Sequence, residues 1–319
     1  MTSKLIFNNP SDAHASPARG CTAAETNRAV AEKISRFRRI FIPYPRHIML
    51  HSRCDYLAEL GEATRGQPQR GMRVLAPSGS GKTTAALSFI ERAKLLAPPK
   101  PGRIPYVYVP LDKSMTVKKL YVLILTCFGD GYTERRNELE LKQRVIALLE
   151  RVRCRLMIID EVQHLAKNSG DVTDSLKNLL DVGAVPIVFL GTEEAEPMFE
   201  RNLQFNGRLL PPCDFAPLRA TVLEDQQLLR GYWERLEAEM VQLGLVARAG
   251  GYADPDFLAA LHKVADGVIG RVSRLTEAAL EICIRRGGDC ITLADLSLAT
   301  EQWAMPQGFV KANPFRSMA

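Results

Sequence analysis

A glycine-rich stretch between a short apolar run and a helical segment restricts the possible folds of this chain more than any other feature. The stretch runs from Ala76 to Thr83 and reads A-P-S-G-S-G-K-T. It follows the strand candidate 72–76 and precedes a predicted helix over 82–96. The spacing is that of a P-loop, in which glycines let the backbone turn so that successive N–H groups point at an anion. We therefore expect a parallel α/β fold with a nucleotide at the carboxyl edge of its sheet.

The side chains of this loop have defined roles at a bound triphosphate, for which we expect ATP with Mg²⁺. Lys82 adds a positive charge that reaches the β- and γ-phosphates, and Thr83 offers its hydroxyl to the metal. The following helix presents its positive N-terminal end to the same anion. The first motif position is Ala76, where glycine is usual, and alanine is small enough to occupy it. The predicted nucleotide-binding residues of the loop are Pro77, Ser78, Gly79, Ser80, Gly81, Lys82, Thr83 and Thr84.

Two later strands are predicted to end in polar residues at the same edge of the sheet. The buried strand over 155–159 leads into Asp160 and Glu161. Asp160 is placed to hold Mg²⁺, and Glu161 is placed to orient or deprotonate a water that attacks the γ-phosphate. The strand over 185–190 is followed by Thr192, whose hydroxyl can bind that water or the γ-phosphate as a nucleotide sensor. The alternative role for this threonine is an ordinary helix N-cap.

The order of apolar runs predicts two domains. Continuous apolar strands that alternate with helices indicate a parallel sheet with helices on both faces, and the pattern becomes purely helical after Pro217. The strand candidates are 72–76, 104–109, 155–159 and 185–190. We expect a flexible N-terminal arm over 1–30, an α/β nucleotide-binding domain with a basic N-terminal segment over 31–220, a small all-helical lid domain over 221–304 and a loose C-terminal tail over 305–319.

Composition argues against several classes of protein. No apolar run approaches the ~20 residues that span a bilayer, and the N-terminus lacks the pattern of a secretion signal, so we expect a cytoplasmic protein with no membrane partner. The seven cysteines are scattered, odd in number and without a C-x-x-C pair, which argues against a disulfide framework or a zinc site. The net charge of +6 is compatible with nucleic acid as a partner but does not require it.

A basic segment precedes the P-loop. Residues 33–54 hold six Lys and Arg side chains and no acidic one, with Phe37, Phe41 and Tyr44 interleaved. Two interpretations stay open. The segment is either a solvated connector whose aromatic side chains dock on the core, or a basic surface for phosphate or an acidic partner.

The P-loop, the Asp-Glu strand end, the threonine after a further strand and the trailing helical domain together resemble the AAA+ ATPases. Short segments of the sequence are similar to the TniB/TnsC family, the ATP-dependent regulators of DDE transposons. The similar segments are 41–46, 158–165, 188–192 and 267–275. This resemblance implies a Mg-dependent ATPase that forms a homo-oligomeric ring or filament on double-stranded DNA without reading its sequence. It also implies that the protein links a DDE transposase and a target-selection protein to the target, and that hydrolysis recycles the complex.

The resemblance implies further site residues. In AAA+ assemblies a neighbouring subunit supplies an arginine to the γ-phosphate, because a guanidinium neutralises the charge that develops there. Arg208 fits that position, and Arg201 is the alternative. Arg271 fits the second nucleotide sensor, with Arg274 one turn later as its competitor. Ring-forming relatives contact DNA through the zone after the second strand, where the basic residues here are Lys113, Lys118 and Lys119; the alternative is an ordinary helix start.

Other functions share these motifs and stay open. An AAA+ ATPase of a secretion or signalling system would act on a protein partner, and a scaffold gated by ATP would bind nucleotide without hydrolysing it. A small-molecule kinase fits less well, because a trailing helical domain does not suggest a dedicated acceptor pocket. His164 follows the acidic pair by three residues and is either a packed core histidine or a polar neighbour of the site. We expect the packed side chain, because no metal-type partner lies at a suitable spacing.

Overall fold

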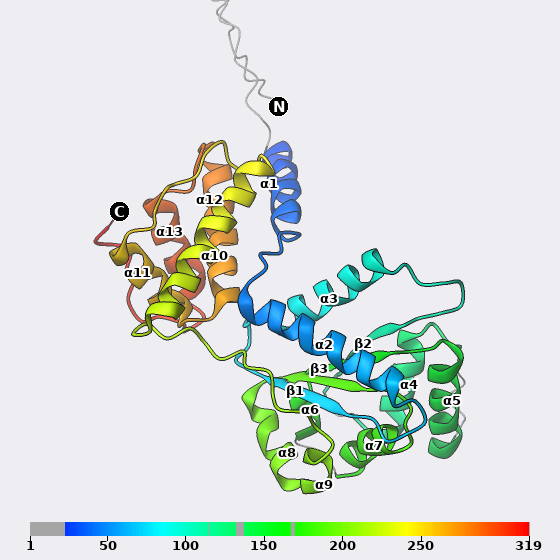
Figure 1. Ribbon diagram of the computed structural model, residues 1–319. Coiled ribbons are helices and arrows are strands. Elements are labelled where there is room, and N and C mark those ends of the chain that lie inside the picture. The colour runs from blue at the N-terminus through cyan, green and yellow to red at the C-terminus, as the bar shows by residue number, and fades with distance from the viewer. Residues whose placement is uncertain (1–22, 114, 132–136, 167–169, 319) are drawn as a thin grey trace, which may run out of the picture.

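A four-stranded parallel sheet forms the centre of the α/β domain (Figure 1). The computed structural model describes residues 23–113, 115–131, 137–166 and 170–318, and in it the strand order is β1-β4-β3-β2. The strands are β1 (Gly71–Leu75), β2 (Tyr106–Pro110), β3 (Leu156–Asp160) and β4 (Ile187–Gly191). The two central strands are buried at every position, as expected for a parallel sheet covered on both faces. The predicted α/β fold class is confirmed.

Alternate residues of β3 show how the two faces are covered. Ile158 packs into the apolar cluster of α2 and α3, whereas Ile159 packs into the cluster of the other helices of this domain. This alternation follows from the two-residue period of a strand. The helices are α2 (Pro45–Ala63) and α3 (Lys82–Leu96) on one face, and α4 (Val117–Cys127), α5 (Glu138–Arg151), α6 (Gln163–Ala166), α7 (Gly170–Asp181), α8 (Glu196–Arg201) and α9 (Leu203–Asn206) with the 3₁₀ turn η1 (Glu193–Ala195) on the other.

After α9 the chain returns along the outer edge of β1. The Gly71 N–H donates to the Arg208 carbonyl at 3.0 Å, and the Leu210 N–H donates to the Gly71 carbonyl at 2.8 Å. Further along, the Cys213 N–H donates to the Arg73 carbonyl at 3.2 Å. This irregular edge pairs with β1 in parallel and leads toward the helical domain.

Helices from both ends of the described chain form the second domain. They are α10 (Leu223–Gln242), α11 (Pro255–Ala265), α12 (Ile269–Arg285), α13 (Leu293–Ala299) and the π-helical turn η2 (Thr300–Ala304), together with α1 (Ala23–Phe37). Figure 1 shows α1 lying beside α12, and Phe37 and Tyr44 share an apolar core with Trp233. Residues 1–22 of the expected arm lie outside the described residues. The expected boundary at residue 30 falls inside α1, which packs in the helical domain. Within the described part of the chain, none of the helices is long and apolar enough to cross a membrane.

Basic side chains of α1 explain this placement. Lys33 Nζ donates to the Leu245 carbonyl at 3.1 Å, and Arg36 donates to the Leu243 carbonyl. These carbonyls lie at and just beyond the C-terminal end of α10, where the helix dipole favours positive charge. Farther along, Arg46 lies 3.8 Å from the buried carboxylate of Asp225. The structure thus favours neither open interpretation in full. Basic groups of the segment bind the helical domain, as do the rings of Phe37 and Tyr44, whereas Phe41 stacks on His47 and His51 of α2.

The C-terminal segment also packs onto the helical domain and is not a loose tail. Phe315 is fully buried, and its ring centroid lies 5.9 Å from that of Phe257. Asn313 Nδ2 donates to the Ser297 carbonyl at 3.0 Å. The physical reason is that the aromatic side chains of this segment complete an apolar core that the helices alone leave open.

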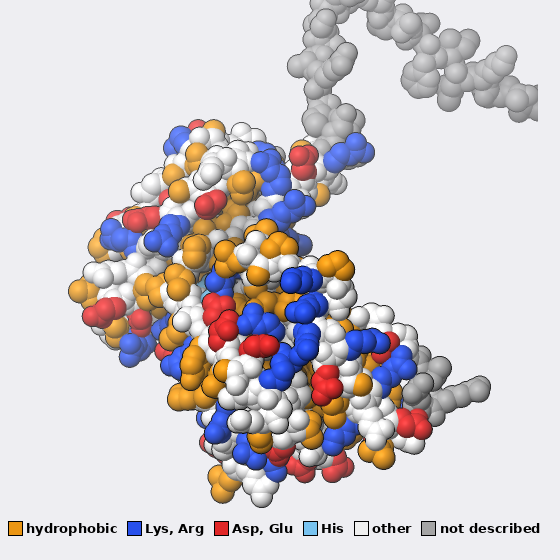
Figure 2. Space-filling view, turned by 45° about the vertical axis from the view of Figure 1, so that its right-hand side comes forward, with side chains coloured by type: hydrophobic (Ala, Val, Ile, Leu, Met, Phe, Trp, Pro, Cys, Tyr) orange, Lys and Arg blue, Asp and Glu red, His pale blue; other side chains and the backbone are white. Residues whose placement is uncertain are grey.

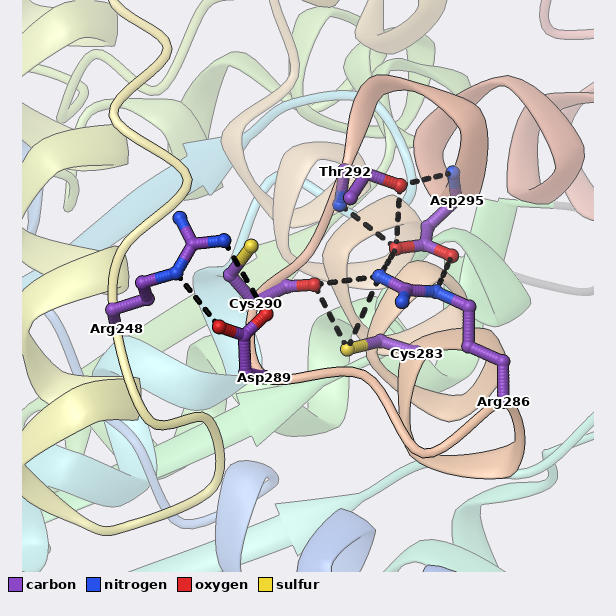
Figure 3. Close-up of polar contacts among 7 residues, drawn as sticks. All are labelled: Arg248, Cys283, Arg286, Asp289, Cys290, Thr292 and Asp295. Atoms are coloured by element: carbon purple, nitrogen blue, oxygen red, sulfur yellow. Dashed lines mark hydrogen bonds and ion pairs between the residues drawn. The ribbon is translucent and has the colours of Figure 1, made fainter.

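A polar network closes the connection between α12 and α13 (Figure 3). Arg286 donates to both oxygens of Asp295, at 2.7 Å each, and to the Cys290 carbonyl at 2.8 Å. Asp295 is 2% exposed and also accepts hydrogen bonds from Thr292, with which it forms a capping box. Burial alone raises the pKa of Asp295, but the hydrogen bonds from Arg286 and Thr292 outweigh it and lower the pKa. The network therefore fixes an ionised carboxylate inside the helical domain.

Replacing Arg286 with Ala is expected to lower the free energy of unfolding by about 2 kcal/mol, because the Asp295 charge stays buried without its counter-ion. Urea denaturation followed by circular dichroism measures the loss. The lowered pKa of Asp295 means that the pair stabilises the fold above the ordinary value of 3.8 and loses this effect as the pH falls through the folded value. The matched control is Arg248→Ala, which breaks an exposed ion pair with Asp289 and should cost clearly less, because solvent screens that pair. Equal losses in the two variants would contradict this reading of the network.

Candidate nucleotide-binding site

A cavity of about 510 Å³ lies where the P-loop, the strand ends and the helical domain meet. Residues 78–84 of the predicted phosphate-binding loop line it, as do Asp160, Glu161 and Thr192 from the ends of β3 and β4. The opposite wall comes from the segment 37–42 and from α12. Pro77 alone among the predicted loop residues does not line the cavity, although its carbonyl accepts a hydrogen bond from Lys82.

The P-loop has the backbone that its glycines predict. Gly79 and Gly81 have φ angles of +81° and +89°, which a residue with a Cβ atom rarely adopts. The loop surrounds Lys82, whose Nζ donates to the carbonyls of Ala76 at 2.7 Å and Pro77 at 3.1 Å. Burial lowers the pKa of Lys82, and the nearby carboxylates oppose this change. The ammonium group is thus held inside the loop by acceptors that a phosphate oxygen, which carries a full charge, can replace.

Asp160 joins the P-loop to the sheet. Thr83 Oγ1 donates to Asp160 Oδ2 at 2.5 Å, and the Tyr108 hydroxyl donates to the same oxygen at 2.8 Å. The other oxygen of Asp160 accepts from the Glu161 N–H at 2.8 Å. Mg²⁺ binds through one or two carboxylates together with substrate phosphates, so this hydroxyl and carboxylate fit the predicted metal site. The sequence analysis missed Tyr108, which burial and the contact with Asp160 hold in its neutral form by raising its pKa.

Glu161 and Thr192 are linked by a third side chain. Gln163 Nε2 donates to Glu161 Oε2, and Gln163 Oε1 accepts from the Thr192 N–H at 3.1 Å. Glu161 has a φ of +62°, a strained conformation for a residue with a Cβ atom, and such strain is concentrated at functional sites. His164 Nε2 lies 4.0 Å from Glu161 Oε2, so this histidine is a polar neighbour of the site instead of a packed core residue. Gln163 lies within the segment 158–165, yet nothing in the sequence assigned it a role.

The hydroxyl group of Thr192 is a buried polar group whose hydrogen bonding is not satisfied by the described residues. Its Oγ1 is inaccessible to solvent and makes no hydrogen bond to any residue that the structure describes. Thr192 occupies the N-cap position of η1, as the alternative interpretation has it, but its side chain makes no capping hydrogen bond. Buried hydroxyl groups are nearly always hydrogen-bonded, and because Thr192 lines the cavity, a rotation of its side chain would bring this hydroxyl to a water or a phosphate oxygen there. The geometry therefore agrees with a ligand at this position.

The first turn of α12 rests on the P-loop. A Cβ atom added to Gly270 would lie 1.9 Å from the Gly79 carbonyl oxygen, so only glycine permits this approach. Arg271 does not line the cavity: its Cζ lies 4.4 Å from the centroid of the Phe309 ring, and its Nη1 lies 3.7 Å from Asp266. Arg274 does line the cavity. The role of Arg271 as the nucleotide sensor stays a prediction: its guanidinium lies over Phe309 of the packed C-terminal segment, while a Cβ atom on Gly79 of the P-loop would come within 3.7 Å of its Cγ.

His47 also lines the cavity, although no motif in the sequence marks it. It lies in the first turn of α2 beside the P-loop, so that a Cβ atom on Gly81 would come within 2.9 Å of its Nε2. The rings of Phe41, Tyr44 and Phe215 lie around it, at centroid distances of 5.1 to 5.7 Å. Burial lowers the pKa of His47 to about 4, so its imidazole is neutral at pH 7. No spacing rule in the sequence marks this residue, which directly follows the segment 41–46.

Arg208 lies at the other end of the sheet from the cavity. Its carbonyl binds the first residue of β1, whereas the P-loop follows the last residue, about 13 Å farther along a strand of this length. Its Nε donates to Asp181 Oδ1 at 2.6 Å. Arg201 ends α8 and is exposed. Neither arginine lines the cavity of its own chain, so either could act only on a neighbouring subunit.

The basic residues predicted to contact DNA follow β2, at the same edge of the sheet as the P-loop. Lys113 and Lys119 are exposed, and Lys118 is half-buried. The Lys119 N–H donates to Thr116 Oγ1 at 3.3 Å, which makes Thr116 the N-cap of α4. None of the three lysines lines the nucleotide cavity, and they remain a predicted DNA contact.

Comparison with known proteins identifies a family and a fold. The family model described as "Bacterial TniB protein" matches residues 35–212, more than half of the chain. No curated protein matches the sequence. Among solved structures, the Aeropyrum pernix ORC2 protein is similar with a TM-score of 0.58 and 16% identity, over 79% of this chain and 67% of that one. Drosophila ORC bound to DNA is similar with a TM-score of 0.57 and 17% identity, over 93% of this chain and 70% of that one.

The Aeropyrum pernix ORC1 protein in complex with DNA has a TM-score of 0.57 and 21% identity, over 79% of this chain and 64% of that one. At these identities the likeness shows the fold alone. It confirms the AAA+ fold with a helical domain after the nucleotide-binding domain.

Proposed function

We propose a function from the premise that this chain belongs to the bacterial TniB family. In this proposal it is an AAA+ ATPase that assembles on double-stranded DNA and connects the target DNA to a DDE transposase and a target-selection protein. The observation that carries the ATPase part is the cavity that gathers Lys82, Thr83, Asp160, Glu161 and Thr192. Together these groups supply a positive charge that can bind phosphate, two oxygen atoms that can bind a metal ion, a carboxylate that can act as a base, and a hydroxyl group without a hydrogen-bond partner among the described residues.

The geometry suggests how this chain cleaves ATP. The triphosphate lies along the P-loop, and Lys82 turns from the loop carbonyls to the β- and γ-phosphate oxygens. Thr83 and Asp160 would hold Mg²⁺, which when bound neutralises phosphate charge. Glu161 accepts a proton from a water as that water attacks the γ-phosphorus, and the bond from the γ-phosphorus to the bridging oxygen breaks to leave ADP. Gln163 keeps the Glu161 carboxylate beside the Thr192 strand end, which orients the attacking water.

We propose that active assemblies contain more than one subunit. Arg208 is too far from the cavity of its own chain, and it pairs with Asp181 in a partly exposed position. An arginine supplied by a neighbour stabilises the charge that develops on the transferred phosphoryl group. Arg208 in this role, with Arg201 as the alternative, would make hydrolysis depend on assembly.

The DNA part of the proposal is supported by charge and by the family. The chain carries a net charge of +6, and on the face shown in Figure 2 Lys and Arg side chains gather over the α/β domain with acidic side chains among them. Lysines bind DNA phosphates as point charges and do not read the bases. The edge of the sheet that holds the nucleotide cavity also carries Lys113, Lys118 and Lys119. DNA and ATP would therefore bind near the same strand ends.

Binding of a fluorescent duplex, with and without a slowly hydrolysed ATP analogue and Mg²⁺, tests this proposal. We expect binding that requires the nucleotide, weakens steeply with salt and is equal for unrelated sequences. Exchanging Lys113, Lys118 and Lys119 for Glu together should weaken binding at least about tenfold, because phosphate contacts are lost and repulsion is added. The control is Lys94→Glu in the exposed last turn of α3. No duplex binding at low salt would contradict the proposal and favour an ATPase that acts on a protein partner.

A further inference from the structure

Two arginines on the wall of the nucleotide cavity share one carboxylate. Arg38, which directly follows α1, donates to Glu277 Oε1 from Nε at 3.0 Å and from Nη2 at 2.6 Å. Arg274 Nη1 lies 3.6 Å from the other oxygen, Glu277 Oε2. All three residues line the cavity. The Glu277 side chain is only 16% exposed, whereas those of both arginines are 62% exposed, so the carboxylate is the enclosed member of the group.

The two contacts differ in strength. Arg38 makes two hydrogen bonds to one oxygen, and its pKa is raised mainly by that bonding to Glu277. Arg274 makes a looser ion pair without a hydrogen bond of ordinary length. Because charge-assisted hydrogen bonds are the stronger kind, Arg274 is the partner that Glu277 releases more easily.

The position of Arg274 on α12 gives it a second possible partner. Gly270 contacts Gly79 of the P-loop, and Arg274 comes about 6 Å later along the helix axis, with Glu277 about 10 Å from the same point. The long side chain of Arg274 therefore starts between the carboxylate and the place where phosphates bind. It can pair with either anion but not with both.

Arg38, in contrast, is held at its position by its own helix. Lys33 and Arg36 of α1 bind the carbonyls of Leu245 and Leu243 at the end of α10. Phe37, the residue before Arg38, is buried in the core of the helical domain. These contacts fix the backbone that precedes Arg38, and the two hydrogen bonds to Glu277 hold its guanidinium.

We propose that Glu277 competes with the bound triphosphate for Arg274, and that Arg38 limits this competition by occupying one oxygen of Glu277. The inference rests on the proposed function, because it needs a triphosphate in the cavity. Without nucleotide, Arg274 pairs with Glu277. With nucleotide, it turns to the phosphates and Glu277 stays neutralised by Arg38. Glu277 and Arg38 are thus positioning residues that set the affinity for ATP through a third side chain.

Three variants test this arrangement by calorimetric titration with Mg-ATP. Glu277→Gln should bind about fivefold tighter, because Arg274 no longer has a competing anion. Arg38→Gln should bind about threefold more weakly, because both oxygens of Glu277 then hold Arg274. The double variant should bind like Glu277→Gln alone, since Arg38 acts only through Glu277. Arg39→Gln is the matched control, as the adjacent exposed arginine lies outside the cavity, and it should bind like the parent.

Several results of these titrations would contradict the inference. Weaker binding by Glu277→Gln would overturn the inference, because the carboxylate would then hold the nucleotide instead of competing with it. A loss in the double variant as large as in Arg38→Gln would also overturn it and make Arg38 a direct ligand. A parent protein that binds Mg-ATP while all three variants match it would refute this inference alone. A parent that binds no Mg-ATP would overturn the proposed function as well.

Discussion

Replacing Glu161 with Gln is expected to lower the rate of ATP hydrolysis by about 10²–10⁴-fold while Mg-ATP binding is kept, because glutamine cannot accept a proton from the attacking water. The amide is close to the carboxylate in size, so the contact with Gln163 and the backbone at this position are preserved. Phosphate release under single-turnover conditions measures the loss. ATP-bound oligomers should accumulate in the variant, and sedimentation of the protein with duplex DNA would detect them.

Glu193→Gln is the matched control for this experiment. Glu193 is an exposed carboxylate one residue beyond Thr192 and does not line the cavity, so its variant should turn over ATP like the parent. Unchanged hydrolysis in Glu161→Gln would remove Glu161 from the role of base. Absence of hydrolysis in the parent, with DNA present, would instead support a scaffold that ATP switches by binding alone.

Replacing Lys82 with Ala is expected to weaken Mg-ATP binding by about 100-fold or more, because the only P-loop side chain with a positive charge is lost. Lys82 itself is buried, and its ammonium group now binds the carbonyls of Ala76 and Pro77 within the loop. Isothermal titration with Mg-ATP measures the affinity, and thermal unfolding without nucleotide checks that the variant is folded.

Lys94→Ala on the same helix serves as the control for Lys82. Its ammonium pairs with exposed Glu91, far along α3 from the P-loop, and its removal should change neither affinity nor fold. Comparable affinities for Lys82→Ala and the parent would show that no triphosphate lies on this loop. The proposed mechanism would then fail at its first step.

The sheet and its catalytic edge could be predicted because they rest on short-range rules. Apolar runs of five residues define the strands, and parallel strands bring their carboxyl ends to one edge, which placed Asp160, Glu161 and Thr192 together. The P-loop glycines are dictated by a backbone that only glycine adopts easily. Each of these rules acts within a few residues, so one sequence is enough to apply them.

The lid side of the site could not be predicted because it depends on contacts between distant segments. Arg271 and Arg274 are one turn apart and chemically identical. Their different surroundings follow from Phe309, which lies against Arg271 and belongs to a segment without apolar periodicity, whereas Arg274 lines the cavity. The contact of Arg38 with Glu277 spans 239 positions of the chain. Nothing in the sequence around either residue indicates its partner.

The helical domain is built from both ends of the described chain, and this arrangement restricts its motion. Two separate connections, near residue 44 and near residue 217, join it to the α/β domain. Two chain connections between the same two domains favour rotation of the helical domain about the line that joins the connections, and they oppose other relative movements of the domains. Because the segment 38–42 is at once a connection and a cavity wall, any such rotation also reshapes the space available to a ligand. A rotation that opened the helical domain would therefore also widen the cavity.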